Sequence, residues 1–252
     1  MGSKINRLNE KNINNCGSEM VIIQYRRCDD IDIYFPQYDW VARGKAYREF
    51  QKGAIKCPYE PRFYRKGFIG EGQYRITYNK KQTKCYNTWC NMLKRCYSEE
   101  YHKKKPTYRD CKVCDEWLNF QNFAKWYEEN YYKIANEEMH LDKDILYKGN
   151  KLYSPNTCVF VPKTINSLFV KCNSSRNNLP IGVNKYKDKF SINYSVGNKY
   201  MSVYNLSNED EAFKQYKIMK ETYIKQIADE YKELIPNILY NALYRYEVEI
   251  TD

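Results

Sequence analysis

Residues 139–169 gather the side chains of this chain that could perform metal-assisted chemistry. His140, Asp142 and Asp144 stand at the start of the segment, and Asn166 lies near its end. Mg²⁺ keeps most of its waters and takes one or two protein ligands, typically a carboxylate and an amide oxygen. Histidine is a suitable general base near neutral pH. The segment therefore predicts a divalent-cation site able to activate water for phosphodiester cleavage. The alternative is a set of polar side chains on a small structural module.

A strand, a turn, a second strand and a short helix must position these side chains. His140 and Asp142 are two residues apart and share one face of a strand, which Asp144 continues. The Ser154–Asn156 turn reverses the chain, and Asn156 can tie this turn by side-chain hydrogen bonds. Pro162 opens a brief helix that directs Asn166 back toward the strand. An isolated histidine such as His140 is also a common half-buried structural residue.

The charge of the chain predicts a polyanionic partner. The 252 residues contain 42 Lys+Arg and 31 Asp+Glu, a net charge of +11. Each phosphate that such a surface neutralises releases condensed counterions, which favours nucleic acid over an anionic membrane surface. A basic surface that only aids solubility is the alternative.

No membrane location is expected. The sequence has no apolar run near the ~18 residues needed to cross a bilayer, and its first fifteen residues are too polar for a signal peptide. The ten cysteines then belong to a reducing cytoplasm and are expected to be mostly free thiols.

The N-terminal part predicts a small β-rich domain over residues 1–80. Residues 1–18 are polar and are expected to form a loose end. Short apolar runs predict strands at 20–25, 31–35, 40–47 and 67–78, which suit a small barrel or curled sheet. Basic residues on this sheet suggest a domain that grips a nucleic-acid backbone, or only a solvated strand face; they are Arg26, Arg27, Arg43, Lys45 and Arg48.

The next part, residues 81–172, predicts two helices that support the central segment. Tyr86, Trp89, Leu93 and Cys96 recur at helical spacing, and a second aromatic stripe begins near Asp115. We interpret both stripes as core. The loop between the helices carries Lys103, Lys104 and Lys105, which can follow a phosphate backbone.

We expect free thiols and no zinc site in this region. Cys111 and Cys114 form a single Cys-x-x-Cys, with Cys96 and His102 upstream. The first pair lacks the spacing of a zinc knuckle, and Cys96 belongs to the apolar face of a helix.

The last part, residues 173–252, predicts a DNA-binding domain after a polar linker. Three strands at 179–187, 189–196 and 199–206 are joined by tight turns at Lys187-Asp188 and Gly197-Asn198. A capping sequence at 207–210 then starts one covering helix. The free face of the sheet can enter a major groove and would present Lys185, Lys187, Lys189, Tyr194 and Lys199 in some combination. With these lysines, the residues expected to contact DNA are Lys103, Lys104, Lys105, Lys163 and Arg176.

Several segments resemble known families. LDKDIL, GNKLYSPNTCVFVP and the pair Ile165-Asn166 resemble the strand–turn–strand–helix unit of bacteriophage HNH homing-type endonucleases. YNTWCNMLKRCYS and CDEWLNFQNFAKW are similar to the helices that precede the motif in such proteins. LPIGVNKYKDKFSINY and EAFKQYKIMKE are similar to the three-strand-plus-helix DNA-binding domain of plant ethylene-response factors (Apetala-type), which phage nucleases often carry. The resemblance covers roughly residues 84–230.

The HNH resemblance implies site roles. Asn156 matches the turn-organising asparagine and Asn166 the last metal ligand. The first element departs from the family, because Met139 precedes His140 where a first ligand is expected. In the other register Asp142 occupies the histidine position and the base is missing. His140 as base, with Asp142 or Asp144 on the metal, would restore a complete site.

The sequence thus predicts an α+β protein: a β-rich accessory domain, helices with an HNH-like unit, and a sheet with one covering helix. The leading hypothesis is a Mg²⁺-dependent (or other divalent-cation) endonuclease that binds double-stranded DNA in the cytoplasm of a bacterium infected by, or carrying, a phage. One alternative is a DNA-binding or interfering protein with a degenerate site. The other is a protein–protein interaction factor that blocks a host protein.

Overall fold

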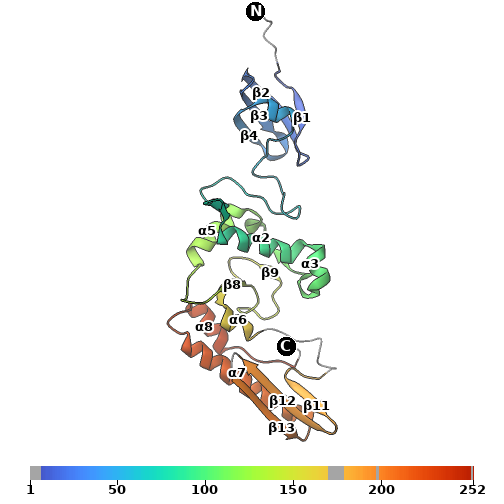
Figure 1. The fold of residues 1–252 in the computed structure, drawn as a ribbon, viewed down its shortest axis with the longest axis vertical. Coiled ribbons are helices and arrows are strands. Elements are labelled where there is room, and N and C mark those ends of the chain that lie inside the picture. Colours follow the sequence, from blue (N-terminus) through green and yellow to red (C-terminus); the bar gives the residue numbers. More distant parts are fainter. Residues whose placement is uncertain (1–6, 170–178, 197–198, 251) are drawn as a thin grey trace, which may run out of the picture. The chain divides into compact units, whose positions relative to one another are not determined.

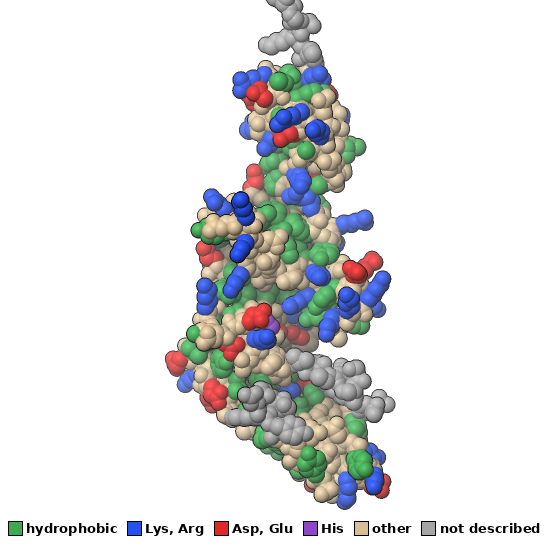
Figure 2. Space-filling view, in the orientation of Figure 1, with side chains coloured by type: hydrophobic (Ala, Val, Ile, Leu, Met, Phe, Trp, Pro, Cys, Tyr) green, Lys and Arg blue, Asp and Glu red, His purple; other side chains and the backbone are tan. Residues whose placement is uncertain are grey.

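The computed structural model describes residues 7–169, 179–196, 199–250 and 252. It confirms the α+β class, with helices and several small sheets (Figure 1) and with charged side chains over its surface (Figure 2). Contacts divide the chain into two compact units. Unit 1 is Met1–Glu129 with Leu152–Ser154, and unit 2 is Asn130–Lys151 with Pro155–Asp252. Each unit is described by itself.

Unit 1 begins with an antiparallel four-stranded sheet in the order β1-β2-β3-β4. Alternation places Ile22, Ile31, Ile33 and Phe35 in a fully buried core. The strands predicted at 20–25, 31–35 and 40–47 are confirmed, whereas the polar start is not all loose, because its strand β1 pairs with β2. The elements are β1 (Lys11–Ile13), β2 (Glu19–Arg27), β3 (Asp30–Phe35), η1 (Pro36–Tyr38), β4 (Trp40–Lys45) and α1 (Tyr47–Gln51).

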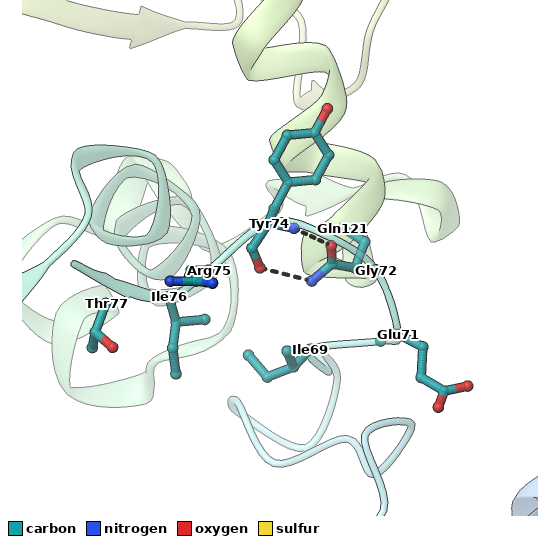
Figure 3. A pocket seen from close by; sticks show the side chains of 9 residues that line it. Ile69, Glu71, Gly72, Tyr74, Arg75, Ile76, Thr77 and Gln121 are labelled. Carbon is teal, nitrogen blue, oxygen red and sulfur yellow. Dashed lines mark hydrogen bonds between the residues drawn. The ribbon is translucent and has the colours of Figure 1, made fainter.

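The strand predicted at 67–78 is wrong. Only Thr77–Tyr78 forms a strand, β5, which pairs with β6 (Lys81–Gln82). The preceding segment instead follows Gln121, whose Oε1 accepts from Tyr74 N (3.0 Å) and whose Nε2 donates to Tyr74 O (3.1 Å; Figure 3). A Cβ on Gly72 would lie 2.3 Å from Gln121 Oε1, so this close approach requires glycine.

The first predicted helix of unit 1 is confirmed, whereas the second, predicted as one helix from Asp115, is divided at the extended residue Asn119 into two. The stretch expected to be a loop contains a further helix, because Ser98 Oγ caps it by accepting from Tyr101 N (3.3 Å). The elements here are α2 (Lys84–Tyr97), α3 (Glu99–Lys104), η2 (Pro106–Tyr108), β7 (Lys112–Val113), α4 (Asp115–Leu118) and α5 (Phe120–Asn130).

The aromatic stripes of these helices form a core, as predicted. Trp89, Trp117 and Phe120 are fully buried. Trp89 Nε1 donates to Trp117 O (2.7 Å), which satisfies the polar atom of the indole, and the Trp89 and Phe120 rings meet edge to face with centroids 5.6 Å apart. Below this core, β9 (Leu152–Tyr153) pairs in parallel with β7.

Unit 2 contains the predicted strand–turn–strand–helix motif. Strands β8 (Met139–Asp142) and β10 (Val159–Pro162) are antiparallel, with His140 opposite Val161. Helix α6 (Lys163–Ser167) begins directly after Pro162, as predicted.

The C-terminal sheet and its helix are also confirmed. The strands β11 (Val183–Tyr186), β12 (Lys189–Val196) and β13 (Lys199–Leu206) lie in this order. The predicted hairpin at Lys187 is present, with φ of 53° at that residue, whereas Gly197-Asn198 lies outside the described residues. Asn208 caps α7 (Glu209–Glu230) by accepting from Glu211 N (2.8 Å), and α8 (Asn237–Tyr244) follows Pro236.

Helix α7 takes part in two hydrophobic cores of unit 2. Its first half buries Ala212 and Tyr216 against the sheet. Its second half buries Ile224, Ile227 and Ala228 in the core that also contains Val161 and Ile165. The sheet, α7 and the strand–turn–strand–helix motif therefore lie in the same unit.

The cysteines that the structure describes are free thiols, as expected. Burial raises the pKa of Cys57 to about 11 and that of Cys85 to about 12. Within the described ranges, no helix is both long enough and apolar enough to span a bilayer.

The shared core predicts a stability difference along α7. Ile224 is fully buried, so Ile224→Ala should lower the free energy of unfolding by about 2–5 kcal/mol through lost burial and a cavity. Ile218, on the same helix, is 56% exposed, so Ile218→Ala should change it by less than about 0.5 kcal/mol. Urea unfolding followed by circular dichroism measures both, and equal losses would contradict the packing described.

Candidate metal centre

The β8–β10–α6 motif brings His140 and Asn166 together. Asn166 Nδ2 lies 3.1 Å from His140 Nδ1. The imidazole lies on β8 and the amide one turn into α6, so the tight connection at Pro162 sets their separation. Both residues are half-buried, and 31% of the His140 side chain is exposed. The pair is therefore preorganised yet open to solvent.

Glu138 lies near the second nitrogen of the His140 imidazole, away from Asn166. Its Oε1 lies 3.5 Å from His140 Nε2. An amide nitrogen can only donate, so with Nδ2 facing the ring His140 Nδ1 accepts, and the ring proton lies on Nε2 toward Glu138. Lys163 Nζ lies 3.8 Å from Glu138 Oε2, which places a predicted DNA contact at the rim of the same site.

A second carboxylate fixes the start of α6. Glu137 Oε1 accepts from Thr164 Oγ1 (2.6 Å) and from Tyr231 OH (2.7 Å). Burial alone would raise the pKa of Glu137, but these hydrogen bonds outweigh it and hold the pKa below the ordinary value. Glu137 thus holds the helix that carries Asn166 against the end of α7.

Asp142 forms a turn. Its Oδ1 accepts from the backbone N–H groups of Asp144 (2.9 Å) and Ile145 (2.7 Å). Burial, followed by the neighbouring carboxylate of Asp144, raises the pKa of Asp142 despite these two donors. Asp144 is exposed and pairs with Lys143 Nζ at 3.3 Å. The structure therefore brings His140 to Asn166, and uses Asp142 to shape the loop that follows β8.

Asn150 ties that loop. Its Nδ2 donates to Lys143 O (2.6 Å), and Lys143 Nζ donates to Asn150 O (3.0 Å). Asn156, predicted to organise the turn, is exposed within a turn of residues 155–157. Among the residues that the structure describes, no hydrogen bond of its side chain is found.

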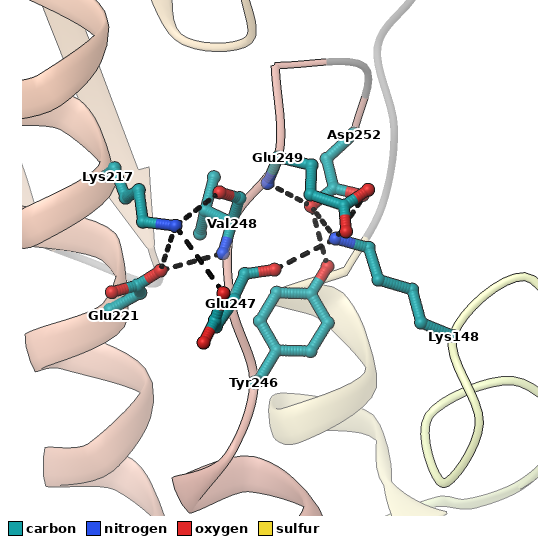
Figure 4. Close-up of polar contacts among 8 residues, drawn as sticks. All are labelled: Lys148, Lys217, Glu221, Tyr246, Glu247, Val248, Glu249 and Asp252. Carbon is teal, nitrogen blue, oxygen red and sulfur yellow. Dashed lines mark hydrogen bonds and ion pairs between the residues drawn. The ribbon is translucent and has the colours of Figure 1, made fainter.

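The segment after α8 anchors the same loop (Figure 4). Lys148 Nζ lies 2.7 Å from Asp252 Oδ2 and donates to Glu247 O (2.8 Å). Asp252 is 3% exposed and also accepts from Tyr246 OH (3.1 Å). The ion pair is buried on one side, so it fixes the loop more firmly than an exposed pair would.

The C-terminal sheet presents a polar face away from α7. The strand register places Asn184, Tyr186, Lys189, Ser191 and Tyr204 on this face. Tyr186 is 76% and Tyr204 62% exposed. The expectation for Tyr194 is wrong, because Tyr194 shares the other face with Ile192 and is buried 6.0 Å from the Tyr216 ring.

The predicted DNA-binding lysines of this sheet occupy different places. Lys189 lies on the polar face, and Lys187 lies at the β11–β12 turn beside the Tyr186 ring (5.5 Å). Lys185 lies over the Phe190 ring at 5.3 Å on the α7 side. Lys199 begins β13, but its side chain is not described, and Arg176 lies outside the described residues.

In unit 1, Lys103 and Lys104 lie in the last turn of α3 and Lys105 at its end, all exposed. A pocket of about 520 Å³ also lies in this unit (Figure 3), between the 69–77 segment and Gln121, with Glu71 and Arg75 on its wall. Two of its polar lining groups have partners within the unit: Glu71 Oε2 accepts from Tyr59 OH (3.2 Å), and Tyr74 OH donates to Glu128 Oε2 (2.8 Å).

No cluster of three or more His, Cys, Asp or Glu that could hold a metal is found within the described ranges, and the His140–Asn166 pair relies on an amide in its place. No family model, curated protein or solved structure matches the chain. The resemblances to HNH nucleases and to ethylene-response factors therefore stay predictions.

Sequence reasoning missed Glu138 and Asn150. Glu138 precedes the strand, two residues before His140, and the same alternation that placed Asp142 on the His140 face could have found it. Asn150 lies in the loop between β8 and β9, and only the path of this loop shows that it faces Lys143.

The role of Asp142 as a hydrogen-bond acceptor predicts different effects of two substitutions on stability. Asp142→Ala leaves the N–H groups of Asp144 and Ile145 without their acceptor and should lower the free energy of unfolding by about 1–3 kcal/mol. Asp142→Asn keeps the accepting oxygen and should preserve the loop. The raised pKa means that wild type loses stability as pH rises from about 4, the unfolded value, through the folded value.

Asp142→Asn cannot ionise and should escape this loss. Urea unfolding at pH 4 and pH 7 measures the effect: relative to wild type, the asparagine variant should gain stability at the higher pH. A relative loss on going to pH 7 would contradict the assigned direction.

Proposed function

We propose that the protein binds duplex DNA and that His140 and Asn166 hold a divalent cation for hydrolysis of a phosphodiester bond. The 3.1 Å approach of His140 Nδ1 to the Asn166 amide carries this proposal. When bound, the cation supplies positive charge to a phosphate oxygen and lowers the pKa of a coordinated water.

The separation of the two side chains fits adjacent ligands of one ion. Two ligand atoms at right angles, each about 2.1 Å from an octahedral cation, lie about 3.0 Å apart. Rotation of the Asn166 amide by a half turn puts Oδ1 in place of Nδ2, and amide orientation is set by the hydrogen-bond partner. Asn166 would then offer an oxygen and His140 Nδ1 a nitrogen lone pair.

Glu138 fits the role of an orienting carboxylate. Metal-binding histidines commonly donate their second ring N–H to a carboxylate, which fixes the tautomer and makes the ligand more basic. Glu138 Oε1, 3.5 Å from Nε2, stands where this partner is needed. Lys163, beside Glu138, can attract a phosphate at the rim.

The imidazole nitrogen and the amide oxygen also affect which cation the site would prefer. Mg²⁺ prefers oxygen ligands, whereas an imidazole nitrogen favours later first-row ions such as Fe²⁺ or Ni²⁺, and Mn²⁺ accepts both. Mn²⁺ is therefore expected to bind more tightly than Mg²⁺ at this pair.

The alternative function is DNA binding without cleavage. The chain contains two histidines, and the other, His102, lies in unit 1 with its Nε2 2.9 Å from Arg95 O. If His140 is a metal ligand, no second imidazole remains in unit 2 to act as a base. The residue directly after His140 is Leu141, which is apolar and buried and cannot take this role. This observation favours a binding protein that retains a cation site.

The exposed sheet face supports a duplex-binding role in either case. Lys189, asparagine and serine side chains offer donors and acceptors to base edges and phosphates, and two exposed tyrosines flank them.

Metal titration and plasmid nicking test the site together. Wild type should bind Mn²⁺ and relax supercoiled plasmid with it. His140→Ala and Asn166→Ala should each abolish both, because each removes one of two protein ligands. Glu138→Gln should weaken Mn²⁺ binding about 10–100-fold through loss of the orienting carboxylate.

Asn166→Asp is the matched control, since it keeps an oxygen ligand and adds a charge that should retain or tighten Mn²⁺ binding. Mn²⁺ binding without nicking would select the alternative function. Unchanged Mn²⁺ binding in His140→Ala would overturn the site.

A further inference from the structure

One segment carries almost the whole net charge of the chain. Residues 61–114 contain 14 Lys+Arg and 4 Asp+Glu, whereas the remaining 198 residues contain 28 Lys+Arg and 27 Asp+Glu. The segment lies within unit 1 and comprises the 61–76 coil, β5, β6, α2, α3, η2 and β7. Figure 2 shows blue side chains spread over the part of unit 1 that holds α2 and α3, with few red ones among them.

These cations are available to a ligand. Arg95 is partly buried, and the other thirteen are exposed. In the described part of the chain, no ion pair or hydrogen bond engages the side chains of these thirteen. They are Arg62, Arg65, Lys66, Arg75, Lys80, Lys81, Lys84, Lys94, Lys103, Lys104, Lys105, Arg109 and Lys112.

Several arginines of the first sheet of unit 1, in contrast, form ion pairs with acidic residues. Arg26 donates to Asp30 and Asp32, Arg27 lies 2.7 Å from Asp29, and Arg43 lies 3.5 Å from Asp32. Acidic neighbours therefore neutralise three of the arginines that the sequence analysis assigned to backbone gripping, whereas Arg48 has no acidic partner among the described residues.

The shapes within the segment suit a phosphate backbone. The β5–β6 hairpin turns at Asn79 and Lys80, both with positive φ, and leaves Tyr78 69% exposed beside Lys81. On α2 an exposed polar stripe without acids runs along one face, formed by Lys84, Asn87, Asn91 and Lys94. Arg75, on the pocket wall, adds a cation beside the hairpin.

We infer that residues 61–114 form the main phosphate-binding surface for duplex DNA. This surface contributes more to DNA affinity than the N-terminal sheet β1–β4 or the C-terminal sheet β11–β13. This inference rests on the proposed DNA-binding function and assigns its principal contact. Nine of the thirteen cations are lysines, which protein–protein interfaces avoid. A phosphate backbone, in contrast, gains from every lysine that displaces condensed counterions.

The number of contacts gives a measurable salt dependence. A footprint of about six phosphates on this surface gives a slope of about −5 for log K against log salt. Removal of three contacting cations should make that slope shallower by about 2–3.

Matched triple substitutions test the surface. Lys80→Gln/Lys81→Gln/Lys84→Gln and Lys103→Gln/Lys104→Gln/Lys105→Gln each remove three charges from it. Arg48→Gln/Lys52→Gln/Lys56→Gln removes three exposed and unpaired charges from the first sheet domain and serves as the control. Fluorescence anisotropy with a labelled 30-base-pair duplex, between 50 and 200 mM NaCl, measures affinity in the full chain.

Each test triple should weaken binding by about 100-fold at 100 mM salt and make the slope shallower, whereas the control should change affinity by less than about 2-fold. If wild type binds DNA but the control variant loses as much affinity as the test triples, the assignment of this surface is overturned while the proposed DNA binding stands. Displacement of DNA by poly-glutamate at equal charge concentration would assign the surface to an acidic protein and overturn it. No binding by wild type at 50 mM salt would overturn both proposals.

Discussion

The contact between the second half of α7 and the β8–β10–α6 motif is the interaction on which the candidate metal centre depends. Two strands of four residues and a five-residue helix bury too little apolar surface to be stable alone. Ile224, Ile227 and Ala228 supply the missing wall, together with Leu239 and Leu243 from α8. The spacing of His140 and Asn166 is therefore maintained by residues far along the chain.

Basic and acidic side chains are concentrated in different segments of the chain. The stretch from 115 to 169, which holds the candidate metal-binding pair, contains 8 Asp+Glu and 6 Lys+Arg, whereas the segment 61–114 before it is strongly basic. An acidic surrounding attracts a cation and repels phosphate, so a chain that uses both benefits from keeping phosphate attraction in a different segment. The ion pairs of the first sheet, by contrast, join neighbouring strands and turns and leave little net charge there.

Local signals predicted much of the fold. Alternation predicted the strands of both sheets, Pro162 predicted the start of α6, and the aromatic stripes predicted the helices that pack through Trp89 and Trp117. The pairing of His140 with Asn166 also followed, because a strand, a turn and a short helix leave few ways to place them. The prediction at 67–78 failed because Gly72 serves a close approach to Gln121 and Gly70 one to Asn119, both of which lie some fifty residues further along the chain.

The chemistry of single side chains was harder to predict. Asp142 could ligate a metal or accept from its own backbone, and only the φ/ψ angles after β8 decide between the two. Asn156 and Asn150 are equivalent as residue types, and the loop path selects Asn150 as the tie. Glu138 lies directly before β8, so only continuing the period-2 pattern beyond the end of the strand would have placed it on the His140 face.

The shared core also fixes when the metal centre can form during synthesis. Ile165 and Leu168 pack with Leu239 and Leu243, which are translated about 75 residues later. At a synthesis rate of 5–20 residues per second, the β8–β10–α6 motif waits roughly 4–15 s for its packing partners. The first sheet and the basic segment of unit 1 can fold during that interval, because their partners, except β9, precede residue 130. On a growing chain, the surface proposed to bind phosphate is therefore complete before the pair that would hold the cation.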